Sequence, residues 1–273
     1  MSTPAPGAVP TRDELRDHLV DALIAGDVRT TREDNLIKYG MLAGRISKAM
    51  FGLEPTGRWN LDDVLDLMVE KVGVSPDRSH LRGQDRIDPD LTIDGLDRMA
   101  EHLGRAGRDR SRVLLATGHP AGLLVVQMAA ATALRAAGAT VLTPGAGFQY
   151  QSMTRWGKVD RHVRYVGDVA VVSATGNLHH THSPVPMRGV LGALAAAGEP
   201  PPDLVMADHG WAGAAGQAGI TSVGFADCND PALFVGEAEG LVAVSVPLDD
   251  NVPPHRYAPM TAYLLHAAGL LQR

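Results

Sequence analysis

The sequence predicts an α/β protein: a mostly parallel, Rossmann-like three-layer sheet with a helical cap region at its N-terminal end. From residue 112 onward, short runs of Val, Leu and Ala alternate with helical patterns, and strands that alternate with helices form parallel sheets covered on both faces. Before residue 112, apolar residues recur mainly at helical spacing. We therefore expect a disordered tail over residues 1–10, a mainly helical cap region over residues 11–110, and an α/β sheet domain that carries the site over residues 111–273.

Helix-start signals define the elements of the first part. Thr11 followed by Glu14 forms a capping-box pattern, and Leu15 and Leu19 then repeat at helical spacing. Asn60 is the expected N-cap of a later helix. The predicted helices begin at residue 11, cover residues 31–50, follow residue 60, and run from residue 92 or 94 to about residue 104.

The second part alternates between short apolar strands and helices that end at glycine or begin at proline. Gly138 and Gly198 close two of these helices, and Pro231 takes the first position of another. The predicted strands cover residues 113–117, 140–143, 162–166, 168–174, 203–207, 221–225 and 241–246, and the predicted helices cover residues 123–137, 187–197, 210–218, 231–239 and 259–271.

The composition excludes several classes of protein. The 273 residues carry a formal net charge of −6 and no basic block, which argues against an extended nucleic-acid surface. Cys228 is the single cysteine, so no intrachain disulfide can form, as is typical of a reducing compartment. The N-terminus lacks a signal-peptide pattern, and the apolar stretch over residues 121–137 is too short for a membrane span and is interrupted by Gln127 and Arg135. We expect a cytoplasmic protein that binds a small phosphorylated substrate, not a nucleic-acid polymer or a membrane; a homodimer is left open.

A glycine turn follows the first strand of the predicted sheet domain and opens a helix. Gly118 and Gly122 would let backbone N–H groups approach an anion at the helix N-terminus, and His119 could donate a hydrogen bond or act as an acid. Neither a Walker loop nor a GxGxxG fingerprint is present. We assign Thr117 and Gly118 to substrate binding and His119 to catalysis. The alternative is a tight turn with a surface histidine.

Histidines and an aspartate mark the next two motifs. His180 and His182 point to the same side of an extended segment and could reach one metal ion or one phosphate; the alternative is a solvated cluster. Asp208 and His209 directly follow an apolar strand, where α/β enzymes place their sites, although Asp208 could instead cap the next helix. The candidate catalytic residues are His119, His180, His182, Asp208 and His209.

Oxygen-bearing side chains follow another strand, at residues 227–230. Asp227, Asn229 and Asp230 suit a hard cation, and Asp208 completes the predicted set of metal ligands. Because these ligands are oxygens, Mg²⁺ or Mn²⁺ is the expected cofactor, although the nearby histidines favour Zn²⁺. Asp230 could instead be only an N-cap. We expect Cys228 to be buried and inert, since no Cys-x5-Arg phosphatase motif begins there.

Two polar clusters lie further from these motifs. Arg32, Asn35 and Asp85 are assigned to substrate binding, because arginine binds phosphate through its planar fork of donors; the alternative is a solvated, charge-rich helical region. Asp249 and Asp250 follow the last strand, and adjacent side chains point to opposite sides. We therefore expect at most one of this pair to face the site, and we assign a role to neither.

Several of these stretches resemble a family of actinobacterial proteins described as phosphatases, some of which lie in gene clusters for nucleoside antibiotics. The matching stretches are residues 83–85, 87–89, 116–120, 180–184, 207–213 and 225–234. The last two are long enough to be specific, and the similarity covers the chain from about Leu15 onward. The resemblance implies hydrolysis of a phosphate monoester and carries no catalytic role to any single residue.

These observations favour a metal-assisted phosphatase that uses water as the nucleophile and acts on a nucleotide-like or sugar phosphate. The cation would polarise the phosphate and activate the water, and histidine would carry the protons. An Asp-x-Asp nucleophile motif is absent after the first strand of the predicted sheet domain, which argues against a covalent aspartyl intermediate. The alternatives are a metal-free lyase or transferase acting on a phosphorylated sugar or nucleoside, and a non-catalytic domain that binds a phosphorylated ligand.

Overall fold

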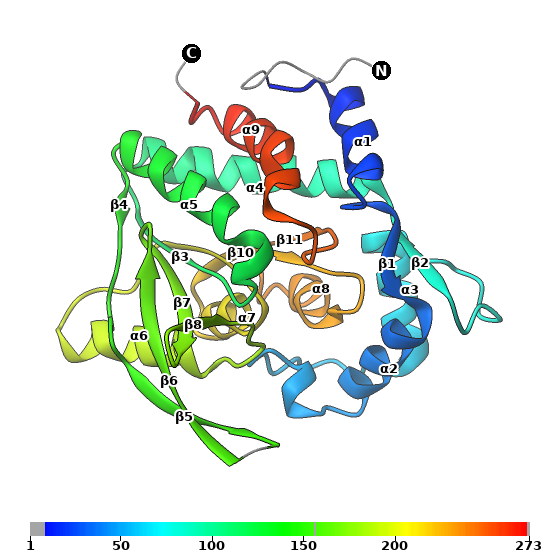
Figure 1. Cartoon of the computed structure of the whole chain (residues 1–273), viewed down its shortest axis with the longest axis horizontal. Helices are drawn as coiled ribbons and strands as arrows, with labels where there is room; N and C mark the ends of the chain where they lie inside the picture. The colour runs from blue at the N-terminus through cyan, green and yellow to red at the C-terminus, as the bar shows by residue number, and fades with distance from the viewer. Residues whose placement is uncertain (1–8, 156, 272–273) are drawn as a thin grey trace.

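A single large sheet runs through the computed structural model, which describes residues 9–155 and 157–271 (Figure 1). Most of the tail expected over residues 1–10 lies outside these described residues. The strands of the sheet, in spatial order, are β11 (Val244–Pro247), β10 (Thr221–Ala226), β9 (Leu204–Asp208), β3 (Arg112–Ala116), β7 (Val169–Ala174), β6 (Gly157–Val166) and β5 (Gln149–Thr154). The short strands β4 (Thr140–Val141) and β8 (Asn177–His179) pair with β3 and β7.

The sheet is parallel from β11 to β7 and antiparallel from β7 to β5. This confirms the predicted α/β class and the mostly parallel sheet, while the Rossmann-like label stays a prediction. Strand β5 was not predicted, because its residues are mostly polar and only alternate between exposed and half-buried positions. It forms with β6 a long hairpin that extends from one end of the sheet (Figure 1).

Two groups of helices cover the sheet. The first group packs together around α4, which lies against β11. The second group is built around α7, which packs on β9 and β10. The first group consists of α1 (Arg12–Asp21), α4 (Pro89–Arg108), α5 (Pro120–Ala136) and α9 (Ala258–Ala267), and the second of α6 (Val185–Ala196), α7 (His209–Gln217) and α8 (Pro231–Ala238).

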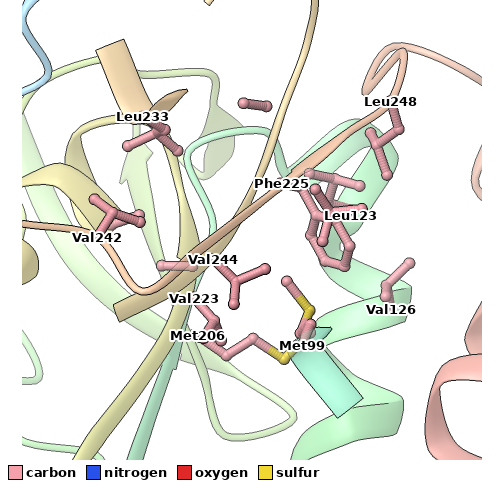
Figure 2. Close-up of a cluster of buried hydrophobic side chains, with 14 of the residues drawn as sticks. Met99, Leu123, Val126, Met206, Val223, Phe225, Leu233, Val242, Val244 and Leu248 are labelled. Carbon is pink, nitrogen blue, oxygen red and sulfur yellow. The ribbon is translucent and has the colours of Figure 1, made fainter. Parts of the chain in front are cut away.

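Buried apolar side chains join the strands to the first helix group (Figure 2). Met206, Val223 and Phe225 of the strands gather with Met99 of α4 and Leu123 of α5, and all five are fully buried. Burial of apolar surface on this scale is the main stabilising term of a fold. The same cluster continues into α1, α2 (Arg32–Ala43) and α3 (Leu61–Val72), so the N-terminal third and the sheet share one core. The domain boundary at residue 110 and the cap role of residues 11–110 stay predictions.

The cap signals of the N-terminal third are confirmed, but the boundaries of two of its helices are wrong. Thr11 and Asn60 form capping boxes at the starts of α1 and α3. The helix expected over residues 31–50 ends at Ala43, and a 3-10 turn, η1 (Ser47–Ala49), follows. Because Asp88 caps α4, this helix starts at Pro89, before the expected start, and runs on to Arg108. A two-stranded antiparallel sheet of β1 (Gly26–Thr31) and β2 (Gln84–Ile87) was not predicted.

Within the described residues, no helix is long and apolar enough to cross a membrane.

Candidate functional site

Four neighbouring parallel strands end at the same edge of the sheet, and polar residues follow each of them. Residues 117–119 follow β3, Asp208 ends β9 with His209 directly after it, residues 227–230 follow β10, and residues 249–250 come soon after β11. Since the carboxyl ends of parallel strands meet at one edge, residues distant in the sequence are brought together. Predicted catalytic and metal-binding residues from three of these four segments therefore do lie close in space.

The predicted histidine segment lies across this edge because two glycines leave room for it. Thr181 donates its backbone N–H to the carbonyl of Gly118 at 2.8 Å. A Cβ atom at Gly118 would clash with the Thr181 carbonyl, and one at Gly210 would clash with the His182 carbonyl. These two glycines thus admit the backbone that carries His180 and His182.

His209 lies at the centre of the site, held by Asp208. Its backbone is left-handed, with φ 47°, and its Nδ1 lies 2.6 Å from Asp208 Oδ2. Asp208 is fully buried and accepts the Gly118 N–H on both oxygens, at 3.1 and 3.0 Å. The Nε2 of His209 is thereby directed toward Asp230 Oδ2, at 3.1 Å, and Asp250 Oδ2, at 3.4 Å. A carboxylate that fixes one ring nitrogen while the other faces a cluster of ligands is typical of metal-binding histidines.

Three further imidazoles surround His209. His182 stacks on its ring at 4.5 Å, and the Nε2 atoms of His180 and His182 lie 2.9 Å apart. His119 stacks on His180 at 4.5 Å. Phe51 contacts His182 and His209 edge-on and closes one side of the cluster. All four predicted histidines therefore belong to one group.

The acidic side chains form a second layer next to these rings. Asp227 is buried, and its oxygens accept hydrogen bonds from the hydroxyl of Thr30 and the N–H of Cys228, each at 2.6 Å. Asp249 and Asp250 are only 2% and 5% exposed. Asp250 forms one group of possible ligands with His209 and Asp230, and both residues of the pair form another with Asp227. The expectation that at most one of the pair faces the site stays a prediction. The signal that could have revealed them is their place after a buried strand, the same place that marks Asp208 and Asp227.

The loop after β11 is held rigidly. The hydroxyl of Tyr257 donates to the Asp249 carbonyl at 2.6 Å and accepts the N–H of Val252 at 3.1 Å. The N–H of Asp249 donates to the Ile24 carbonyl at 2.8 Å. On the other side, the Asp250 carbonyl lies so close to Gly122 that a Cβ atom there would clash with it. These contacts fix the position of both carboxylates.

The charges of the cluster depend strongly on burial. Desolvation, with help from His209, lowers the pKa of His180 to about 4 and that of His182 to about 3. Burial opposes the charged form of His209, but Asp230 and Asp208 outweigh it and raise its pKa well above the usual value. Burial, and then the charges of Asp250 and Asp249, raise the pKa of Asp227 well above its usual range. His180 and His182 are therefore neutral, the state in which an imidazole binds a cation, whereas His209 must release a proton when it binds one.

Three overlapping groups have ligand atoms within 4.8 Å of one another: His180, His182 and His209; His209, Asp230 and Asp250; and Asp227, Asp249 and Asp250. Two of the four predicted metal ligands, Asp227 and Asp230, lie in these groups. Asp208 is instead bound to Gly118 and His209, and the amide of Asn229 donates to Asp34 at 2.7 Å. Asp208 and Asp230 occupy N-cap positions, yet neither side chain makes a capping hydrogen bond. The alternative interpretation of Asp208 and Asp230 as side-chain N-caps is therefore wrong.

A cavity of about 100 Å³ opens beside the cluster. Lys38, Lys48, Phe51 and His182 line it together with Asp230. Lys38 is half-buried, and within the described residues it has no acidic partner at ion-pair distance. The helices α5, α7 and α8 also begin at this edge, and the positive end of a helix dipole favours an anion. The cavity therefore offers positive charge to a phosphate group.

The predicted phosphate-binding turn is arranged differently from our expectation. The N–H of Gly118 is bound to Asp208, and the hydroxyl of Thr117 accepts the N–H of His119 at 2.9 Å. The backbone of Gly118 therefore positions Asp208, and it is not available to a phosphate oxygen. Lys38 was not among the predicted site residues, but its ammonium group supplies positive charge in the cavity.

Arg32, Asn35 and Asp85 form a buried network of their own. Asp85 accepts hydrogen bonds from Arg32 at 3.1 Å and from Asn35 at 2.9 Å, and also from the N–H of Ser75 at 3.0 Å. Asn35 also accepts the Cys228 thiol at 3.5 Å, so the network supports the loop over residues 227–230 from behind. None of the three predicted residues lines the cavity. Cys228 is fully buried, as expected.

The mostly parallel sheet, with its polar side chains clustered at the strand ends, places the chain among the α/β proteins. Comparison with known sequences shows its family. A protein-family model described as Phosphatase matches residues 10–272, so the chain belongs to the Phosphatase family. Phosphatase SCO2771 of Streptomyces coelicolor is 51% identical over 269 residues, which cover 98% of this chain and 99% of that protein. The expected resemblance to actinobacterial phosphatases is confirmed, and the link to nucleoside-antibiotic gene clusters stays a prediction.

Proposed function

We propose that this phosphatase hydrolyses a small phosphate monoester with the help of a divalent cation held by His209, Asp230 and Asp250. The observation that carries the proposal is the orientation of His209: Asp208 fixes its Nδ1, and its Nε2 faces two buried carboxylates. His180 and His182 extend the ligand group, because their ligand atoms lie within 4.8 Å of that of His209. A cation bound there would neutralise phosphate charge and lower the pKa of a bound water.

The nitrogen atoms in this group change the expected metal. Imidazole suits Zn²⁺ and other transition metals, whereas a group made only of carboxylates suits Mg²⁺ or Mn²⁺. A mixed set of histidine and aspartate favours Mn²⁺ or Zn²⁺ over Mg²⁺ at this position. Manganese is the metal on which the sequence-based expectation and the donor set agree.

The residues around the cation divide the remaining work. Lys38 would bind the phosphate oxygens in the cavity, and water would attack the phosphorus as the ester bond breaks. His119 would then protonate the leaving alkoxide, because the carboxylate of Asp250, 2.9 Å from its Nδ1, outweighs burial and raises its pKa. The cavity volume of about 100 Å³ is well below the roughly 300–1,000 Å³ of pockets that enclose whole ligands. The phosphoryl group would enter, and the organic part would remain at the exposed edge near Lys48.

Phosphate release from a panel of nucleoside and sugar phosphates tests the proposal. The metal-free protein should be inactive, and added Mn²⁺ should restore activity to the wild type but not to His209→Asn. The exposed His266 provides the matched control, His266→Asn, which should behave as wild type. Full activity in excess chelator would refute the metal role. Binding of phosphate esters without phosphate release would favour a lyase, a transferase or a non-catalytic binding domain.

A further inference from the structure

Three buried carboxylates lie directly behind the proposed cation site. Asp227, Asp249 and Asp250 come from the loops after β10 and β11, and their oxygens lie within 4.8 Å of one another. We propose that they bind a second divalent cation and that Asp250, which belongs to both ligand groups, bridges the two metals. This inference rests on the proposed function for the first cation and adds a second, separate site.

The charge of this group requires compensation. None of the three residues is more than 5% exposed. Within the described residues, no lysine or arginine lies at ion-pair distance from them, and Asp250 has only His119 and His209 as basic neighbours. Buried carboxylates without a lysine or arginine partner are costly, because low-dielectric surroundings neither solvate nor screen them. A bound divalent cation would offset the repulsion between these neighbouring carboxylates.

One oxygen atom of the group makes no hydrogen bond to the described residues. Asp250 Oδ2 is buried and accepts no hydrogen bond from the described residues. His209 Nε2 lies 3.4 Å from this oxygen. Buried polar atoms are almost always hydrogen-bonded, so an unpartnered carboxylate oxygen inside a group of ligands indicates a missing cation. Asp250 belongs to both groups of possible ligands, as a bridging residue must.

The two sites differ in chemistry. The first contains imidazole nitrogens, whereas the second offers only carboxylate oxygens, the ligands preferred by Mg²⁺ and Mn²⁺. Mn²⁺ accepts both kinds of ligand, so one metal could fill both sites. A pair of cations can stabilise both the attacking and the leaving oxygen of a phosphoryl transfer.

One carboxylate of the second site lies at a separate opening on the surface. A depression of about 280 Å³ on the surface is lined by Asp249, Arg29, Thr30 and Asn229. It is a different opening from the cavity beside Lys38 and His182, although Asn229 lines both. A cation could therefore reach Asp249 while the phosphate cavity is occupied.

The number of bound metal ions tests the inference. The protein is loaded with Mn²⁺ and desalted, and its metal content is measured by native mass spectrometry and by elemental mass spectrometry. Wild type and the exposed control Asp160→Asn should hold two Mn²⁺ per chain, and Asp249→Asn should hold one. The electron paramagnetic resonance spectrum of the wild type should show a spin-coupled pair, and that of Asp249→Asn an isolated ion. One Mn²⁺ in the wild type, or two in Asp249→Asn, would overturn the inference. Active enzyme with a single Mn²⁺ would leave the proposed function intact.

Thermal unfolding gives a readout that does not depend on activity. In chelator, Asp249→Asn should unfold at a higher temperature than wild type, because it removes a carboxylate from a crowded, buried group while keeping the oxygen that accepts the N–H of Asn251. In Mn²⁺ the order should reverse, because wild type gains two cations. The same order in both conditions would contradict a cation at Asp249.

Discussion

His209 combines backbone strain with a fixed ring. Its φ of 47° is left-handed, which costs a residue with a Cβ atom roughly 1–2 kcal/mol. This strain recurs at functional sites, where surrounding contacts hold the residue in place. Here the Asp208 carboxylate and the stacked ring of His182 provide those contacts, at 2.6 Å and at a centroid distance of 4.5 Å. The strain thus turns the ring toward Asp230 and Asp250.

The bond between Asp208 and His209 should control metal affinity. Asp208→Asn keeps the size of the side chain but removes the charge that fixes the imidazole, so metal affinity and kcat/KM should both fall about 10–100-fold. Isothermal titration with Mn²⁺ and phosphate-release kinetics check this. The exposed Asp109 offers the control Asp109→Asn, which should change neither value. Unchanged affinity in Asp208→Asn would show that His209 needs no support from this carboxylate.

Lys38 should act on substrate binding more than on the chemical step. Loss of one charge-assisted hydrogen bond to phosphate, worth about 1.5–3 kcal/mol, should raise KM in Lys38→Gln by roughly 10–100-fold. The wild-type KM should also rise with salt more steeply than that of the variant, because a partly exposed charge is screened. Lys71→Gln on α3, which does not line the cavity, is the control. A change in kcat alone would assign Lys38 a different role.

Individual site residues were predictable where a strand ended in a polar residue. Asp208, His209, Asp227 and Asp230 stood out for this reason, and all lie at the site. Their division into metal ligand and supporting group was not predictable, since it depends on the N–H of Gly118, to which Asp208 turns. The role of Arg32 was equally hidden, because the sequence does not reveal that Asp85 already binds its guanidinium.

At the scale of elements, local signals located the starts of helices better than the strands of a polar hairpin. Thr11, Asn60 and Pro231 mark the helix starts α1, α3 and α8 as expected, because a cap depends on neighbouring residues alone. β5 was missed because its pairing with β6 is tertiary, and its Gln, Ser and Thr residues carry no buried-strand pattern.

Two glycine substitutions should separate close packing from helix propensity. Gly122→Ala would place a Cβ atom against the Asp250 carbonyl, so it should lower the free energy of unfolding by about 1–3 kcal/mol and displace the loop with Asp249 and Asp250. Gly40→Ala lies in the interior of α2 with nothing within 4 Å, so it should raise stability by about 0.5–1 kcal/mol. Urea unfolding measures both. If both variants changed the free energy of unfolding equally, the structure around Gly122 would have to accommodate the new Cβ atom without a loss of stability.

At the scale of the whole molecule, the proposed ligands tie the ends of several strands together. Because a cation would bind only the folded chain, it should add about 2.7 kcal/mol of stability when the free metal is at 100 times its Kd. Chelation should therefore lower Tm by roughly 5–10 °C for a protein of this size. Calorimetry with and without chelator checks this. The His209→Asn protein should show a smaller shift, and an unchanged wild-type Tm would contradict metal binding.

The order of strands at the site edge has a consequence for biosynthesis. From β3 toward β11, the neighbouring strands β9, β10 and β11 follow one another in chain order. The ribosome therefore synthesises the site residues in the order His119, Asp208, Asp227 and Asp250. Folding during translation proceeds from the N-terminal side. A nascent chain that has formed everything through α8 would still lack the carboxylate shared by both proposed metals. Newly synthesised molecules should therefore stay inactive until β11 pairs with β10 at the edge of the sheet.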